Sequence, residues 1–364
     1  MKSSKIKNFI KKFLFFRNSS ENKKYFVIGL REKQVLSCLP KESTLLIARN
    51  FQDIFYALSN GYSFSYVGLS ELSIYKAYFE RNENLLDQTA EKVFKILHSN
   101  QELSFLISFG DTAPIEIISR CAAKMRDNNF LTICVQHGLL LNDYHENYFE
   151  EGSFSDYLLV MGSTQLKAAE NIFEESLKVL NSGPMWEPHK VEEVGSLEVV
   201  LIAHGGGKIG KDDSQLAEKT FKRLSARLEK NDIPYVYRPH PDGTSSSSLY
   251  KSKLDVSEKQ IILSGKPKVF VGFVSSLLYE AHLAGHTSVG ISLEKDKSTM
   301  KNNPKLSFEP DYLISPDHFE KFCKEISQKN TIKKISRGEL TEVPLKERLK
   351  ETFREIELIE LRTS

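Results

Sequence analysis

The chain has 364 residues, of which 40% are hydrophobic and 27% charged, a composition typical of a globular protein long enough for two α/β domains. Its 50 basic and 48 acidic side chains nearly balance, so no global positive field points to nucleic acid, and we expect none among its partners. The four cysteines form no C-x-x-C pair, which favours buried thiols in a reducing cytoplasm.

Residues 1–18 combine basic and apolar side chains at helical spacing. The basic residues are Lys2, Lys5, Lys7, Lys11, Lys12 and Arg17, and the apolar ones are Ile6, Phe9, Ile10, Phe13 and Phe16. A basic amphipathic helix of this kind can lie in an anionic membrane surface, although packing on its own domain is the alternative. With neither a cleavable signal peptide nor a spanning run in the sequence, we expect a cytoplasmic protein held peripherally on the inner face of the cell membrane.

The first half of the chain alternates short apolar runs with amphipathic segments. Strands are predicted at 24–29, 44–48, 64–67, 103–109, 130–135 and 157–161, and helices at 50–58, 85–98 and 114–125. Strands that alternate with helices form a parallel sheet with right-handed crossovers. This pattern predicts a Rossmann-like domain over 19–185.

After a connector around 182–188 the alternation starts again. Strands are predicted at 199–203, 235–237, 269–271 and 288–291, and helices at 216–231, from Ser275, at 317–328 and at 345–361. This pattern predicts a second Rossmann-like domain over 186–335, followed by a segment, 336–364, whose helix packs back on the first domain. The expected fold class is α/β, with two Rossmann-like domains facing across a cleft.

Polar residues follow the strands of the second half. Arg238 and His240 come after strand 235–237, where Pro239 and Pro241 restrict the backbone of His240. Both side chains can supply charge to phosphate oxygens, although a structural histidine in a rigid turn is the alternative.

The predicted helix that starts at Ser275 and Ser276 offers a second phosphate contact. Backbone N–H groups and the helix dipole favour an anion there, although capping is the commonest role of serine at such a position. Glu280, one turn further on, can accept hydrogen bonds from ribose hydroxyls. The backbone can approach a ligand closely where His204, Gly205 and Gly206 follow strand 199–203.

In the first half, Gln136, His137 and Gly138 follow strand 130–135, and Asp111 follows strand 103–109. A neutral imidazole at His137 could remove a proton from an acceptor hydroxyl, or it could simply cap the sheet edge. Glu151, in the acidic stretch 149–152, competes with His137 for the role of base, although a solvated loop is the alternative. Gln136, Gly138 and Asp111 are expected on the acceptor side.

These motifs, in this order, resemble those of GT-B-type transferases of bacterial surface glycans. The resemblance covers roughly residues 100–295 and includes CDP-glycerol glycerophosphotransferases, bacterial sialyl- and polysialyltransferases and capsule Kdo transferases. Its carriers are Gln136-His137-Gly138, Arg238-Pro239-His240-Pro241 and the serine-rich helix start Ser275-Ser276-Leu277. The sequence before that helix, Gly272-Phe273-Val274, is closer to the sialyl and Kdo groups than to the Asp-Tyr-Ser-Ser of the glycerophosphotransferases.

The resemblance implies a glycosyltransferase or glycerophosphotransferase of GT-B type. The donor would be a cytidine-nucleotide-activated sugar or polyol phosphate. The acceptor would be the lipid-linked glycan of a capsule, lipopolysaccharide or teichoic-acid-like polymer. His240 would stabilise the leaving phosphate. The resemblance implies no cofactor and metal-independent chemistry, in line with the absence of metal-ligand spacing in the sequence. Two alternatives stay open: a non-catalytic nucleotide-sugar-binding or assembly subunit of a glycan export complex, and a nucleotide-sugar epimerase.

Overall fold

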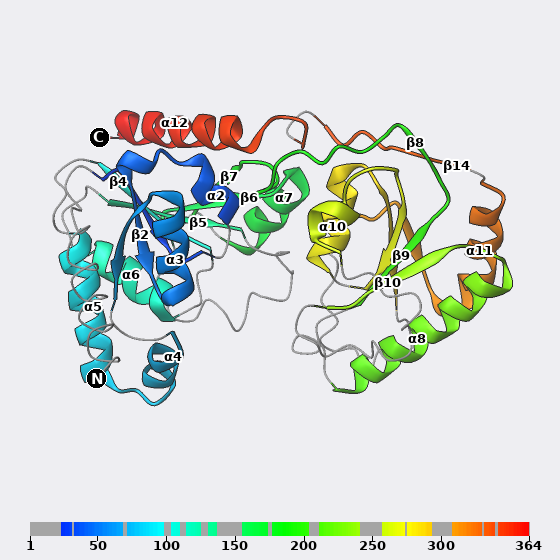
Figure 1. The fold of residues 1–364 in the computed structure, drawn as a ribbon, viewed down its shortest axis with the longest axis horizontal. Coiled ribbons are helices and arrows are strands. Elements are labelled where there is room, and N and C mark those ends of the chain that lie inside the picture. Colours follow the sequence, from blue (N-terminus) through cyan, green and yellow to red (C-terminus); the bar gives the residue numbers. More distant parts are fainter. Residues whose placement is uncertain are drawn as a thin grey trace. The chain divides into compact units, whose positions relative to one another are not determined.

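The computed structural model contains two compact units. It describes residues 23–30, 33–67, 71–97, 103–109, 114–124, 130–136, 155–173, 177–203, 211–240, 257–273, 275–292, 308–329, 331–338 and 341–363. Unit 1 comprises 1–137, 144–186 and 344–364, and unit 2 comprises 138–143 and 187–343. Each unit has its own sheet (Figure 1). The predicted amphipathic segment 1–18 lies outside the described residues.

Unit 1 is built on a parallel sheet in the order β3-β2-β1-β4-β5-β6-β7. Its strands are β1 (Tyr25–Ile28), β2 (Thr44–Ala48), β3 (Ser63–Tyr66), β4 (Ser104–Ser108), β5 (Phe130–Val135), β6 (Tyr157–Val160) and β7 (Lys178–Asn181). Strands β2, β4, β5 and β6 are buried along their whole length, which explains their continuous apolar runs. The direction of winding reverses between β1 and β4, so the switch point of unit 1 lies there.

Helices connect these strands. They are α2 (Lys33–Cys38), α3 (Phe51–Asn60), α4 (Glu71–Phe79), α5 (Glu83–Leu97), α6 (Pro114–Lys124) and α7 (Ser163–Ile172), with a 3-10 turn at Lys41–Ser43. Helix α3 shows why the local sequence folds in this way. The Asn50 side chain accepts the Asp53 N–H at its start, and Gly61 ends it with a φ of 77°.

The last helix, α12 (Leu345–Thr363), belongs to unit 1 and lies along it in Figure 1. Phe353 packs against the rings of Tyr25 and Phe105, with centroid distances of 5.4 and 5.5 Å. Arg348, only 2% exposed, donates to the backbone carbonyls of Ser182, Pro184 and Trp186. The helix is therefore attached both to the sheet and to the segment that leaves it.

Unit 2 has a second parallel sheet, in the order β10-β9-β11-β12-β13. Its strands are β9 (Val199–Ile202), β10 (Tyr235–Arg238), β11 (Val269–Gly272), β12 (Thr287–Ile291) and β13 (Tyr312–Ile314). The helices are α8 (Lys211–Lys230), α9 (Lys259–Ile262), α10 (Ser276–Ala284) and α11 (Phe319–Ser327), with a 3-10 turn at Pro316–His318. An antiparallel ribbon joins β8 (Val194–Ser196) to β14 (Thr331–Lys333).

The core of unit 2 lies between the sheet and helices α8 and α11. The Phe221 ring meets Tyr237 and Phe273 edge-on, with centroid distances of 6.2 and 4.9 Å. These contacts fix the ends of β10 and β11 at the carboxyl edge of the sheet.

The two strand orders confirm the predicted α/β class with two Rossmann-like halves. Several elements differ from the prediction. Helix α4 and strands β7 and β13 have no counterpart in it, because they are short and partly exposed and so lack a continuous apolar run. Helix α8 begins at Lys211 instead of 216, because its first turn is polar and carries no hydrophobic period. Among the described residues, no helix is long and apolar enough to cross a membrane.

Candidate functional site

The carboxyl edge of the unit 2 sheet brings several predicted site residues together. Strand β9 lies between β10 and β11, so the winding reverses at β9 and the switch point follows its end. Arg238 on β10 and Gly272 on β11 are both in register with Ile202, which places them about 10 Å apart, or two strand spacings. His240 follows Arg238 by two residues and is half-buried. Open α/β sheets bind their ligands in the crevice outside such a switch point.

Helix α10 begins at the same edge, directly after β11. Ser275 is its N-cap residue, with extended backbone angles, and the Ser275 Oγ accepts the N–H of Leu277 at 3.2 Å. The backbone carbonyl of Ser275 accepts from Leu278 and Tyr279. Ser276 is half-buried at the first helical position. Capping is therefore observed at Ser275. The positive end of the helix dipole lies at the carboxyl edge of the sheet, where it favours an anion.

Two charged side chains of this edge hold the segment that leads into α9. The Arg238 guanidinium donates to the backbone carbonyl of Ser257. Lys259 forms an ion pair with Glu280 of α10, with 2.8 Å between Nζ and Oε2, and the Glu280 side chain is only 7% exposed. The sequence did not indicate either contact. In the described residues Glu280 therefore anchors the start of α9, and its predicted contact with ribose stays a prediction.

Unit 1 presents a buried carboxamide pair at the end of β5. Gln136 Oε1 accepts the backbone N–H of Met161 at 2.8 Å, and its Nε2 donates to Gln165 Oε1 at 2.5 Å. Since Oε1 accepts a backbone N–H, the Nε2 of Gln136 must be the group that faces Gln165. Gln136 is 4% exposed and Gln165 0%. This pair attaches the end of β5 to β6 and α7 at the point where the chain continues into His137.

Other predicted site residues lie outside the described residues. In the first half of the chain these are Asp111, His137, Gly138 and Glu151, and in the second half they are His204, Gly205 and Gly206.

Unit 2 also contains histidines that the sequence did not single out, among them His286, which is buried, and His282, which is half-buried. Burial lowers the pKa of His286 to about 4, and its ring nitrogens contact Lys268 N and the Leu263 carbonyl. Burial likewise lowers the pKa of His282 to about 4. The ring of His282 contacts Ser288 at 2.9 Å. Ser288 stands near the start of β12, so these histidines belong to the amino edge of the sheet, opposite the candidate site.

A half-buried ion pair lies at the same amino edge. Arg337 holds both carboxylate oxygens of Asp311 at 2.6 Å, and Ser288 donates to one of them from its backbone N–H and its hydroxyl. Burial alone would raise the pKa of Asp311, but these hydrogen bonds lower it below the usual value. The side chains of Arg337, Asp311 and Ser288 bond to one another and hold β12 in place, so this network has a structural role and needs no ligand. In the part of the chain that the structure describes, no group of three His, Cys, Asp or Glu side chains could hold a metal ion.

The fold and this site place the chain in the class of α/β proteins built from two doubly wound units. In unit 2 of this protein a capped helix N-terminus lies at the sheet's switch point. No family model matches the chain, and no curated protein matches its sequence.

Solved structures with a similar fold include those of a wall teichoic acid polymerase and of a glycosyltransferase. A variant of the wall teichoic acid polymerase TagF is 11% identical, with 89% of this chain and 88% of that chain covered and a TM-score of 0.46. The calicheamicin glycosyltransferase CalG4 is 11% identical, with coverages of 92% and 94% and a TM-score of 0.45. MurG of Acinetobacter baumannii is 12% identical, with coverages of 90% and 95% and a TM-score of 0.42. Similarities at this level carry no argument about the chemistry of this chain, for which the strand order and the site residues are the evidence.

Proposed function

We propose that this protein is a GT-B-type glycosyltransferase or glycerophosphotransferase. It would transfer a sugar or polyol phosphate from a cytidine-nucleotide donor to a bacterial surface glycan. One observation carries the proposal: Arg238, followed closely by His240, and the N-terminus of α10 at Ser275 lie at one carboxyl edge, on either side of β9. The motif resemblance supplies the substrate class.

Unit 2 would bind the donor. The backbone N–H groups at Ser275 and Ser276 and the α10 dipole would hold the nucleotide phosphate. Arg238 and His240 would stabilise the charge that develops on that phosphate as it leaves, a role that needs no metal ion. The loop with His204, Gly205 and Gly206 would pass close to the ligand. Glu280 would support this edge through its ion pair with Lys259.

Unit 1 would bind the acceptor. His137 or Glu151 would remove the proton of the acceptor hydroxyl, and Gly138 and Asp111 would line the same side. The Gln136–Gln165 pair supports this proposal, because it fixes the end of β5 directly before His137 in the sequence. The acceptor would be lipid-linked, and the basic segment 1–18 would hold the protein at the inner membrane surface.

The direct test is nucleotide release from a panel of activated donors. The panel contains CMP-sialic acid, CMP-Kdo, CDP-glycerol, CDP-ribitol and UDP-sugars, each with a lipid-linked acceptor extract. One cytidine donor should be turned over, and His240→Ala should lower kcat by at least a hundredfold. The matched control is His318→Ala, an exposed histidine after β13, three strands away from β9. Undiminished turnover in His240→Ala would contradict the assignment.

Two other outcomes identify the alternatives. Thermal stabilisation by a nucleotide, without release from any donor, would indicate a binding or assembly subunit. Interconversion of the sugar in the absence of an acceptor would indicate an epimerase.

A further inference from the structure

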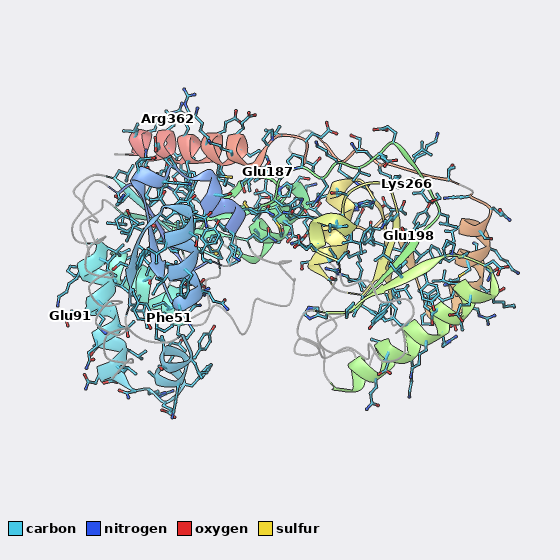
Figure 2. The ribbon with its side chains drawn as sticks, viewed as in Figure 1. Phe51, Glu91, Glu187, Glu198, Lys266 and Arg362 are labelled. Atoms are coloured by element: carbon cyan, nitrogen blue, oxygen red, sulfur yellow. The ribbon has the colours of Figure 1, made fainter. Side chains whose placement is uncertain are left out.

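Helix α3 of unit 1 exposes two phenylalanine rings. Phe51, labelled in Figure 2, is 59% exposed and Phe55 is 67% exposed, although phenylalanine is usually buried in folded proteins. The inner side of α3 packs on β2 and β3, with Ile54 and Ala57 buried. Residues four apart lie one above the other on a helix, so the two rings form a short apolar strip on its outer side. An exposed apolar strip beside polar residues is typical of a binding surface.

The strip begins at the carboxyl edge of the unit 1 sheet. Phe51 is the first residue of α3, and its ring stacks on that of Tyr66, the last residue of β3, with a centroid distance of 6.3 Å and an angle of 29° between the rings. Tyr66 is in register with Ala48, the last residue of β2. Because Tyr66 supports Phe51 while most of the Phe51 ring stays exposed, this edge offers a flat aromatic face.

The side chains beside the rings are polar but uncharged. Gln52 and Ser59 are exposed three residues before and four residues after Phe55, which places them next to it on the helix surface. The one acidic residue of α3, Asp53, is 2% exposed, and the helix contains neither lysine nor arginine. A helix that lies on an anionic membrane carries cations on its polar side, so the composition of α3 does not fit that surface.

Rings, a carboxamide and a hydroxyl together match the chemistry of a sugar. A pyranose ring presents C–H bonds on its faces and hydroxyl groups around its rim. The face of an aromatic ring carries partial negative charge and attracts the partial positive charge of such C–H bonds. The Gln52 carboxamide and the Ser59 hydroxyl can donate to and accept from the hydroxyl groups of the rim.

The strip lies beside the switch point of unit 1. Strands β2 and β3 are the first and second strands from β1, which places their ends about 5 and 10 Å away from it along the edge. A single sugar bound at the switch point between β1 and β4 is too short to cover the rings as well. The following residues of a longer chain would reach them.

We propose that Phe51 and Phe55, with Tyr66 behind Phe51, form a stacking surface for neutral sugar residues of a glycan chain. The identification of this chain as the acceptor rests on the proposed function, whereas the stacking surface itself does not. The acceptor would then be recognised over several of its sugar residues and not by its end alone.

Saturation-transfer NMR tests the surface at its own atoms. The aromatic protons of the full-length protein are irradiated in the presence of maltohexaose, laminarihexaose or chitohexaose, and the transfer to the ring C–H protons of the sugar is measured. At least one hexasaccharide should receive saturation, and its monosaccharide at the same concentration of sugar residues should receive at least fivefold less. The absence of transfer to all three hexasaccharides would overturn the proposal.

Three exposed phenylalanines supply the matched variants. The double variant Phe51→Ser/Phe55→Ser removes the strip, and Phe79→Ser removes a ring that is 76% exposed on α4, a helix that packs on α5 and α6. Substitutions at exposed positions change stability little, so both proteins should fold. The transfer should fall at least fivefold in the double variant and stay within twofold of the wild type in Phe79→Ser. Equal transfer in the double variant and the wild type would refute the assignment.

The same variants identify other occupants of this surface. Loss of sedimentation with anionic vesicles in the double variant, with residues 1–18 present, would overturn the proposal in favour of a membrane-facing surface. Self-association in analytical ultracentrifugation that the double variant loses would overturn it in favour of a contact between two copies. Saturation transfer needs no donor nucleotide, so a failure of every donor in the release assay would count against the proposed function and leave the stacking surface in place.

Discussion

Replacement of Arg348 with methionine should destabilise unit 1 strongly. The guanidinium is 2% exposed and donates to three backbone carbonyls, those of Ser182, Pro184 and Trp186. Methionine has a similar stem but no donor, so three carbonyl oxygens lose this donor in a buried place. At about 1.5 kcal/mol for each hydrogen bond to a charged group, the loss in free energy of unfolding is roughly 4–5 kcal/mol.

Urea denaturation followed by circular dichroism measures this loss, and the midpoint should fall while the slope of the unfolding free energy against urea stays constant. In a thermal scan the same loss would lower the Tm of unit 1 by about 10 °C. Arg354→Met on the exposed face of α12 is the matched control, and its effect should stay within about 0.5 kcal/mol. A loss below about 1 kcal/mol in Arg348→Met would refute the reasoning, because it would mean that water replaces the arginine at no cost.

Three further predictions concern the membrane segment, the carboxamide pair and the buried His286. Deletion of 1–18 should abolish sedimentation with anionic vesicles at low salt and leave nucleotide binding unchanged; a deleted protein that still sediments would contradict the attachment. Gln165→Leu should remove the acceptor that the buried Nε2 of Gln136 uses on α7, at a cost of about 1–3 kcal/mol of stability. The same variant should lower kcat more than it raises KM. A purely structural role would leave kcat of the folded fraction unchanged. His286 has a pKa of about 4 in the folded chain against an ordinary value of 6.5, so the unfolded state binds more protons between these values. Stability should therefore fall by on the order of 3 kcal/mol as the pH drops from 7 to 4, and urea melts of His286→Gln should show a smaller dependence on pH over that interval.

The architecture could be predicted from the sequence, because buried parallel strands appear as continuous apolar runs. Strand β5, buried along its whole length, is predicted with its observed bounds. Strand β7 has no fully buried residue and an exposed lysine at its start, so nothing distinguishes it from a loop. The ribbon of β8 and β14 joins segments more than 130 residues apart, and pairing over such a separation leaves no local signal.

The candidate site likewise contains residues that a local sequence pattern predicts and residues whose contacts depend on the fold. A serine before an apolar helical run is a local signal, and Ser275 is the N-cap residue of α10. The contacts that give other residues their roles are made across the fold. Lys259 of α9 meets Glu280 of α10 through an ion pair, and Gln136 at the end of β5 meets Gln165 of α7.

The attachment of α12 to unit 1 has a consequence for how the protein is made. Unit 1 takes its sheet from the early part of the chain, but its buried residues include Leu345, Phe353 and Ile356. On a translating ribosome the sheet of unit 1 emerges first, but its core cannot be completed until these residues are synthesised. The sheet of unit 2 can form earlier, because all of its strands lie between residues 199 and 314. The half that is synthesised first is therefore completed last, and a nascent chain stalled before residue 345 would expose apolar surface around Tyr25 and Phe105 to chaperones.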